Sequence, residues 1–162
     1  MGVSGSGKST LLNALTDRLG WRGMEADDLH SASNVSKMRR GIPLDDTDRR
    51  PWLAAVAAEM SRWKQEGIPG VVACSALSLA ARERLRAADP DCLFVYLKAD
   101  LPLIENRLKS RTGHFMPATL AQSQFEALEP PAPEERPLTI PAGQAIEKSV
   151  EQVVAEIARR SG

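Results

Sequence analysis

The chain has 162 residues, the length of one ordinary domain and enough to bury a hydrophobic core. Hydrophobic residues make up 43%, and 21 Lys and Arg balance 21 Asp and Glu, so no net field draws the chain to nucleic acid or to a membrane surface. No segment approaches the roughly 18 consecutive apolar residues of a membrane helix, and the first residues do not have the pattern of a secretory signal. The chain has only two cysteines, and both lie in apolar runs. We therefore expect a cytoplasmic protein.

Apolar spacing and the positions of Gly and Pro predict helices and strands that alternate along the chain. In chain order we expect a helix at 8–19, a strand at 21–25, helices at 31–40 and 46–65, a strand at 70–77, a helix at 79–88, a strand at 92–99, helices at 100–111 and 120–128, a strand at 138–140 and a helix at 145–160. This alternation favours a parallel sheet covered by helices on both faces. No repeat divides the chain, so a single domain over residues 1–162 is predicted, with ligands at the carboxyl ends of the strands.

The opening residues, MGVSGSGKST, contain the complete phosphate-loop pattern G-x-x-x-x-G-K-[ST]. Gly5 and Gly7 let the backbone turn its amides toward phosphate oxygens, and the helix that begins at Lys8 adds its positive end. Lys8 can reach the β- and γ-phosphates, and the Ser9 hydroxyl can ligate Mg²⁺. A flexible turn before an ordinary helix is the alternative. The predicted ATP-binding residues are Gly2, Val3, Ser4, Gly5, Ser6, Gly7, Lys8, Ser9 and Thr10.

Such a loop normally follows a buried strand, and here Met1 is the whole of that strand. Loss of a central strand removes buried side chains and both of its ladders, which we expect to outweigh the roughly 5–15 kcal/mol that stabilises a domain. We therefore expect the recorded start to lie downstream of the true one, with about six apolar residues encoded upstream. The alternative is a truncated, non-catalytic chain that does not bind ATP.

Two further segments bear on what the phosphoryl group is transferred to. EADDLH, at residues 25–30, comes at the end of the strand expected at 21–25. A carboxylate in this segment could accept the proton of an attacking hydroxyl or hold Mg²⁺ through water. The alternative is that it only caps the next helix. KMRRGIPLDDTDRRPW, at residues 37–52, is rich in arginine. Because guanidinium groups bind carboxylates in a bidentate fork, this segment suits an anionic small molecule. Solvated helix faces are the alternative for each single residue.

Seven segments occur in order: GVSGSGKST, ADDLH, KMRRGIPLDDTDRRPWL, VVACSAL, LFVYLKAD, RLKSRTGHFMP and QSQFEALEPP. Together they resemble the gluconokinase family, small P-loop carbohydrate kinases, from Met1 to the last helix. The resemblance implies a three-layer αβα P-loop NTPase fold with a parallel sheet, a mobile lid at about 112–122, and a first strand missing from this chain. It implies a homodimer that transfers the γ-phosphoryl of ATP, with Mg²⁺, to the 6-hydroxyl of D-gluconate.

The same resemblance assigns roles to single residues. Asp27 matches the acidic residue that orients the acceptor hydroxyl, and Arg49 is the candidate for the gluconate carboxylate. The implied catalytic residues are Lys8, Asp27, Arg107 and Arg111. The implied substrate-binding residues are Asp27, His30, Arg49, Cys74, Ser75, Arg82, His114 and Gln124. Packing is the alternative for Cys74 and His114, and a surface ion pair is the alternative for Arg107.

This chain departs from the family pattern at two places. Glu25 stands where the family usually has Asp, and Ser78 and Leu79 stand where it usually has two lysines. We expect these changes to affect affinity and rate more than substrate class. A related kinase that acts on shikimate or on a nucleoside monophosphate is the enzymatic alternative, and the segment at residues 37–52 argues against it.

Overall fold

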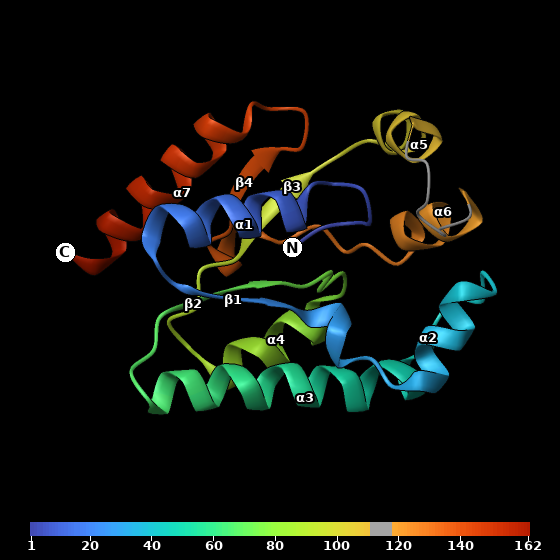
Figure 1. Ribbon diagram of the computed structural model, residues 1–162, viewed down its shortest axis with the longest axis horizontal. Helices are drawn as coiled ribbons and strands as arrows, with labels where there is room; N and C mark the ends of the chain where they lie inside the picture. The colour runs from blue at the N-terminus through green and yellow to red at the C-terminus, as the bar shows by residue number, and fades with distance from the viewer. Residues whose placement is uncertain (111–117) are drawn as a thin grey trace.

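In the computed structural model, which describes residues 1–110 and 118–162, helices and strands alternate as the periodicity predicts (Figure 1). The α-helices are α1 (Lys8–Leu19), α2 (Ala32–Arg39), α3 (Asp46–Gln65), α4 (Leu79–Ala88), α5 (Leu101–Ser110), α6 (Ala118–Glu126) and α7 (Ile146–Ser161). The strands are β1 (Arg22–Glu25), β2 (Gly70–Ala73), β3 (Val95–Lys98) and β4 (Leu138–Pro141), and short 3-10 helices occupy Ala26–Leu29 and Pro133–Glu135. None of the helices in this described part combines the length and apolar character needed to cross a bilayer.

Capping residues determine where several helices begin and end. The Asp45 carboxylate accepts from the Asp48 N–H while the Asp48 carboxylate accepts from the Asp45 N–H, a capping box that starts α3. The Ser78 hydroxyl accepts from the Ala81 N–H at the start of α4. Gly20, at φ 67°, ends α1 in the left-handed conformation. These local signals explain why the predicted bounds of α1, α3 and α4 are confirmed.

The four strands form two parallel pairs. β1 pairs with β2, from Arg22↔Gly70 to Glu25↔Ala73, and β3 pairs with β4, from Val95↔Leu138 to Lys98↔Pro141. The expected single sheet is therefore present as two halves. Both long predicted strands, at 70–77 and 92–99, are shorter than the apolar runs that predicted them, because the strand structure ends where a paired neighbour ends.

The first two residues of the chain lie between the two strand pairs. The Met1 amino nitrogen donates to the Val95 carbonyl at 2.5 Å, and the Leu97 N–H donates to the Met1 carbonyl at 3.0 Å. The Gly2 N–H donates to the Ser75 carbonyl at 3.1 Å, just beyond β2. Met1 and Gly2 thus connect one half of the sheet to the other.

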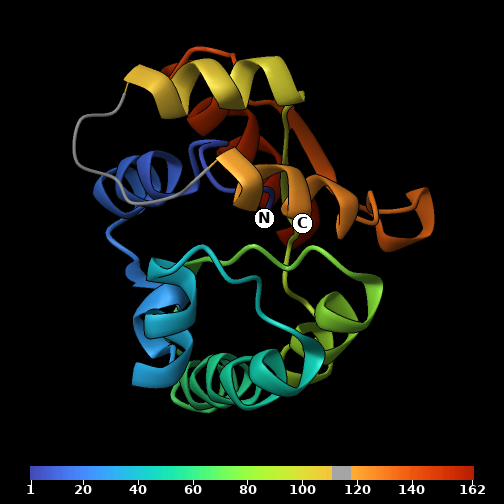
Figure 2. The same ribbon diagram turned by 90° about the vertical axis from the view of Figure 1, so that its right-hand side faces the viewer.

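Helices cover both faces of the strands (Figures 1 and 2). On one face, α3 and α4 contribute Trp52, Val56 and Leu85 to a buried cluster. On the other, α1 and α7 contribute Leu11, Leu15 and Val153 to a second cluster. A third cluster joins the phosphate loop to the helices at one end of the molecule; its buried members are Val3, Leu77, Ile104 and Ala121. This is the three-layer αβα arrangement that was expected.

Gly70 marks a close approach between β2 and α3. A Cβ atom added at Gly70 would lie 2.3 Å from two ring atoms of Trp63. We expect Gly70→Ala to lower the free energy of unfolding by about 1–3 kcal/mol, because a buried indole ring must move. The measurement is the urea midpoint. Gly143→Ala is the matched control, since nothing lies within 4 Å of its added Cβ, and equal midpoints for the two variants would contradict the prediction.

Candidate active site

The phosphate loop runs from Gly2 to the first residue of α1. Gly5 and Gly7 have φ angles of 78° and 103°, which glycine adopts without strain. At Gly2 an added Cβ would lie 2.9 Å from the Leu97 carbonyl oxygen, so only glycine fits against β3. The loop leads into the N-terminus of α1, where the free amides and the positive end of the helix dipole attract anions.

Lys8 crosses the inside of this loop. Its Nζ donates to the carbonyl oxygens of Gly2 at 3.0 Å and Val3 at 2.9 Å. Removal from water lowers the pKa of Lys8, and the nearby carboxylates of Asp27 and Glu25 oppose this shift. The lysine therefore contacts the phosphate loop and is influenced by the charge of the acidic segment at the end of β1.

Two side chains from distant parts of the sequence form hydrogen bonds with the backbone of the loop. The Ser4 N–H donates to Gln124 Oε1 of α6 at 2.6 Å. Arg107 of α5 donates to the Gly5 carbonyl at 3.0 Å and to the Ala142 carbonyl, beyond β4, at 2.7 Å. The predicted site residues Gln124 and Arg107 are thus brought to the loop.

The residues of the loop fit a nucleotide that carries its own magnesium. Ser6 Oγ is buried and has no hydrogen-bond partner among the described residues. Ser9 and Thr10 are exposed at the start of α1. No cluster of three or more His, Cys, Asp or Glu side chains that could hold a metal occurs in the described ranges. This donor set suits Mg²⁺, which proteins usually bind through one or two side chains together with substrate phosphates.

The acidic segment after β1 is fixed from beneath by α3. Trp52 Nε1 donates to the Ala26 carbonyl at 2.6 Å, and the His30 ring stacks on the same indole with a centroid separation of 4.3 Å. His30 Nε2 lies 3.9 Å from Asp27 Oδ1. Burial lowers the pKa of His30, so the imidazole is neutral at pH 7. The Asp27 side chain is 71% exposed and faces outward.

The arginine-rich segment between α2 and α3 is held by polar contacts. Asn34 Nδ2 donates to the Asp48 carbonyl at 2.9 Å, and Lys37 Nζ lies 2.7 Å from Asp48 Oδ1. The Lys37 hydrogen bond lowers the pKa of Asp48. Arg49 lies 4.0 Å from Asp46 with its side chain 34% exposed, a weak surface contact that leaves the guanidinium accessible to a ligand.

Comparison with known proteins agrees with this arrangement. A family model described as an AAA domain matches residues 1–131. A probable gluconokinase of Xenopus tropicalis is 40% identical, with 99% of this chain and 92% of that protein covered. A gluconokinase of Gluconobacter oxydans is 41% identical, with 98% and 87% covered. The chain belongs to the gluconokinase family. The crystal structure of a gluconokinase from Sinorhizobium meliloti superposes with a TM-score of 0.88 at 41% identity and covers 98% of this chain and 89% of that one.

Within this gluconokinase-family fold, the structure gives Arg82 partners inside the protein. The residue is 1% exposed. Nε and Nη2 donate to the two carboxylate oxygens of Glu135 at 2.5 and 3.0 Å, and Nη1 donates to the carbonyls of Ala76 and Leu77 at 3.2 and 3.1 Å. All three nitrogens have partners inside the protein, so Arg82 positions the turn at residues 76–77, and its contact with substrate stays a prediction.

The turn that Arg82 supports lies at the carboxyl end of β2. Ala76 has a φ of 44°, which is unfavourable for a residue with a side chain. Cys74 is buried, and burial raises the pKa of its thiol to about 11, so it packs in the core and is not a nucleophile. Ser75 contributes its carbonyl to Gly2. Ser75 thereby contacts the phosphate loop, and the role of this turn as the floor of the substrate pocket stays a prediction.

Two predicted site residues of this gluconokinase-family chain, Arg111 and His114, lie outside the described residues, as does most of the predicted lid at 112–122. A cavity of about 230 Å³ lies beside the loop, between α1 and the segment after β4. Thr10, Gln144 and Ser149 line it. Sequence reasoning missed Gln144 and Ser149; their place just after the last strand, at the edge where ligands bind, was the available signal.

The Arg82–Glu135 pair provides a test of the positioning role. We expect Arg82→Met to lower the free energy of unfolding by about 3–5 kcal/mol, because it leaves Glu135 and two carbonyls without their buried partner. Arg84→Met, at an exposed position on the same helix, is the control and should leave stability unchanged. The measurement is denaturant unfolding without ligands. A stable Arg82→Met protein with a raised gluconate KM would instead support a direct substrate contact.

Proposed function

We propose that this chain is a gluconokinase that transfers the γ-phosphoryl of ATP to the 6-hydroxyl of D-gluconate, giving 6-phosphogluconate and ADP. The observation that carries the proposal is the position of Lys8, which contacts the phosphate loop and lies within electrostatic reach of Asp27. Asp27 follows β1, at the carboxyl end of the strand, which is the edge where ligands bind in parallel sheets. The names of relatives about 40% identical over nearly the whole chain support the choice of acceptor.

The phosphate side of the site is formed by Gly2 to Thr10. Loop amides and the N-terminus of α1 stabilise the phosphate charge, and Lys8 moves from the Gly2 and Val3 carbonyls to the β- and γ-phosphates. Bound Mg-ATP supplies the phosphoryl group and a metal ion that neutralises charge. Ser9, exposed at the first turn of α1, is the proposed ligand to that metal.

The acceptor side is formed by residues from two segments. Asp27 orients the gluconate hydroxyl and accepts its proton, while the neutral His30 beside it lines the pocket. Arg49 binds the gluconate carboxylate through its planar guanidinium, which is preorganised for a bidentate contact. A hydroxyl held at one end and a carboxylate held at the other fix the direction of the sugar acid.

Catalysis in this proposal comes from positioning and charge neutralisation. Arg107 lies against the phosphate loop, where a cation stabilises charge that develops on the transferring group. From the family resemblance, Arg111 beside the lid at about 112–122 is a further catalytic residue, and His114 in that lid binds the substrate. Gln124 contacts the start of the loop. We further propose a single-domain cytoplasmic enzyme that forms a homodimer.

Lys8 tests the nucleotide half of this proposal. We expect Lys8→Met to reduce kcat by about 10³-fold or more, because one preorganised positive charge is removed from the phosphates. ADP release in the presence of gluconate measures the effect. Circular dichroism provides the control for folding, since Lys8 also bridges two carbonyls of the loop. A folded variant with unchanged turnover would contradict the assignment.

Arg49 tests the acceptor half. We expect Arg49→Ala to raise the gluconate KM about 10- to 100-fold with little change in the ATP KM, since it removes a charge-assisted bidentate contact worth roughly 1.5–3 kcal/mol. Arg50→Ala, at the adjacent exposed position of α3, is the matched control. If both variants keep the normal gluconate KM, the carboxylate is bound elsewhere.

A further inference from the structure

Asn34, on α2, carries a buried amide that the proposed reaction does not use. The residue is 4% exposed. The Ser31 hydroxyl accepts from the Asn34 N–H at 3.2 Å and caps the start of α2, which fixes the backbone that carries the amide. A polar side chain at this depth needs hydrogen-bond partners, and the atoms around the amide therefore show what it does.

A backbone group of α3 fixes the orientation of this amide. Asn34 Nδ2 donates to the Asp48 carbonyl at 2.9 Å. Because a carbonyl oxygen can only accept, the nitrogen of the amide has to face it. The opposite orientation would place two oxygens against each other in the interior and leave both without a donor.

The same Asn34 nitrogen also faces the ring of His30. Asn34 Nδ2 lies 3.4 Å from His30 Nδ1, at the long end of hydrogen-bond distances. An amide nitrogen has two protons to donate and cannot accept, so Nδ1 is the accepting, unprotonated nitrogen of the ring. A neutral imidazole carries one proton, and that proton is then on Nε2.

The packing around His30 holds the ring in this orientation. The side chain is 4% exposed, and the ring stacks on Trp52 with a centroid separation of 4.3 Å and an angle of 15° between the planes. A ring turned over by 180° would present a carbon atom to Asn34, and the amide would lose an acceptor. Burial lowers the pKa of His30, which keeps the ring uncharged at pH 7.

The proton on Nε2 lies on the edge of the ring that faces Asp27. Nε2 is 3.9 Å from Asp27 Oδ1, too far for a direct hydrogen bond, but a hydroxyl oxygen can lie about 2.8 Å from both atoms. The carboxylate accepts, the Nε2–H donates, and a hydroxyl does both, so one hydroxyl satisfies the pair. With the proton on Nδ1, both groups would accept, and the single proton of a hydroxyl could satisfy only one.

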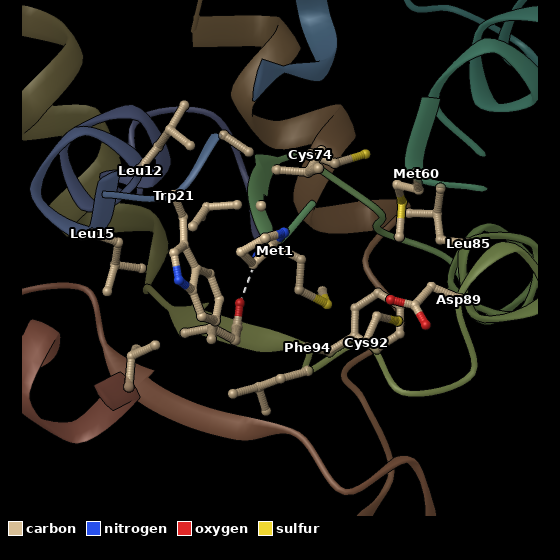
Figure 3. Close-up of a pocket in the computed structure, with 18 of the residues that line it drawn as sticks. Met1, Leu12, Leu15, Trp21, Met60, Cys74, Leu85, Asp89, Cys92 and Phe94 are labelled. Atoms are coloured by element: carbon tan, nitrogen blue, oxygen red, sulfur yellow. Dashed lines mark hydrogen bonds between the residues drawn. The ribbon is translucent and has the colours of Figure 1, made fainter. Parts of the chain in front are cut away.

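The largest cavity of the molecule offers a sugar acid no such arrangement. It has a volume of about 520 Å³, lies between the two strand pairs, and is lined mainly by apolar side chains, among them Leu12, Leu15, Leu85 and Phe94 (Figure 3). Apolar walls leave the hydroxyls of a polyol without partners. The polar edge beside Asp27 is the place that suits them.

We infer that Asn34 is a positioning residue that holds the His30 imidazole with its proton on Nε2, and that His30 and Asp27 together bind one hydroxyl of the acceptor. This inference rests on the proposed function, in which Asp27 orients the acceptor hydroxyl. The hydroxyl donates to Asp27 and accepts from His30, and these two bonds fix the direction of its remaining lone pair. A ketone or ether oxygen in this place has no proton for the carboxylate, so the pair selects a hydroxyl.

Ring-nitrogen chemical shifts of ¹⁵N-labelled protein test the tautomer without substrate or nucleotide. We expect His30 to carry its proton on Nε2 in the natural chain and on Nδ1 in Asn34→Asp at about pH 9, because the new carboxylate accepts from Nδ1–H. The signals that His30→Gln removes identify the ring. Ser33→Ala, at an exposed position of α2, is the matched control and should keep the natural pattern. A natural chain with the proton on Nδ1 would overturn the inference, whether or not it phosphorylates gluconate.

The pH dependence of kcat/KM for gluconate tests the consequence. In the natural chain Nε2 carries a proton in both the neutral and the charged ring. In Asn34→Asp only the charged ring keeps it, so the donor is lost as the pH rises through the pKa of His30. We expect kcat/KM of Asn34→Asp, relative to the natural chain, to fall about tenfold or more from about pH 6 to about pH 9. A reduced but constant ratio would show a merely structural role and overturn the inference.

The charged groups around His30 are the same in the two proteins apart from the new carboxylate. Asp27 faces the ring from the segment after β1, and Lys37 of α2 pairs with Asp48 of α3 beyond Asn34. The ratio of the two kcat/KM values therefore isolates the change at Asn34.

His30→Gln provides the control background, because a glutamine amide donates from its nitrogen and has no tautomer to set. In this background Asn34→Asp should lower kcat/KM by the same factor at both pH values. A pH-dependent factor that persists without the imidazole would assign the effect to another group and overturn the inference. A chain that has the expected tautomer but does not phosphorylate gluconate would support the role of Asn34 and reject the proposed function.

Discussion

The phosphate loop depends on two residues, Met1 and Gly2, whose backbone connects the two halves of the sheet. Three main-chain hydrogen bonds, to Val95, Leu97 and Ser75, fix the start of the loop against strands from both halves. A loop that binds phosphate through its amides requires such a fixed start, because amides must point at the ligand before it arrives. The position of Lys8 and the direction of α1 follow from this anchor.

The rest of the site is attached to that anchor by single contacts from distant segments. Trp52 holds the acidic segment through the Ala26 carbonyl, and Gln124 and Arg107 hold the loop from the opposite side. Arg82 supports the turn after β2 from within the core. Each contact joins a helix to the phosphate loop or to a segment that follows a strand. The parallel topology therefore gathers groups that are far apart in the sequence.

Much of the fold could be predicted because its signals are local. The capping pair of Asp45 and Asp48 and the left-handed Gly20 determine helix ends without reference to distant residues. Strand ends were less accurate, because Cys74 and Cys92 continue an apolar run beyond the residues that find a paired neighbour. The internal pairing of Arg82 was not predicted for a related reason: its partner, Glu135, is 53 residues away.

The sequence by itself determined the phosphate loop, the order of helices and strands, and the family, because these depend on residue types at fixed spacing. Only the tertiary structure decided which charged groups are exposed and which are paired inside the protein. Asp27 is exposed while Arg82 is buried, although both belong to conspicuous motifs. Burial is a property of the packed chain: it depends on neighbours contributed by remote segments, and no local pattern encodes them.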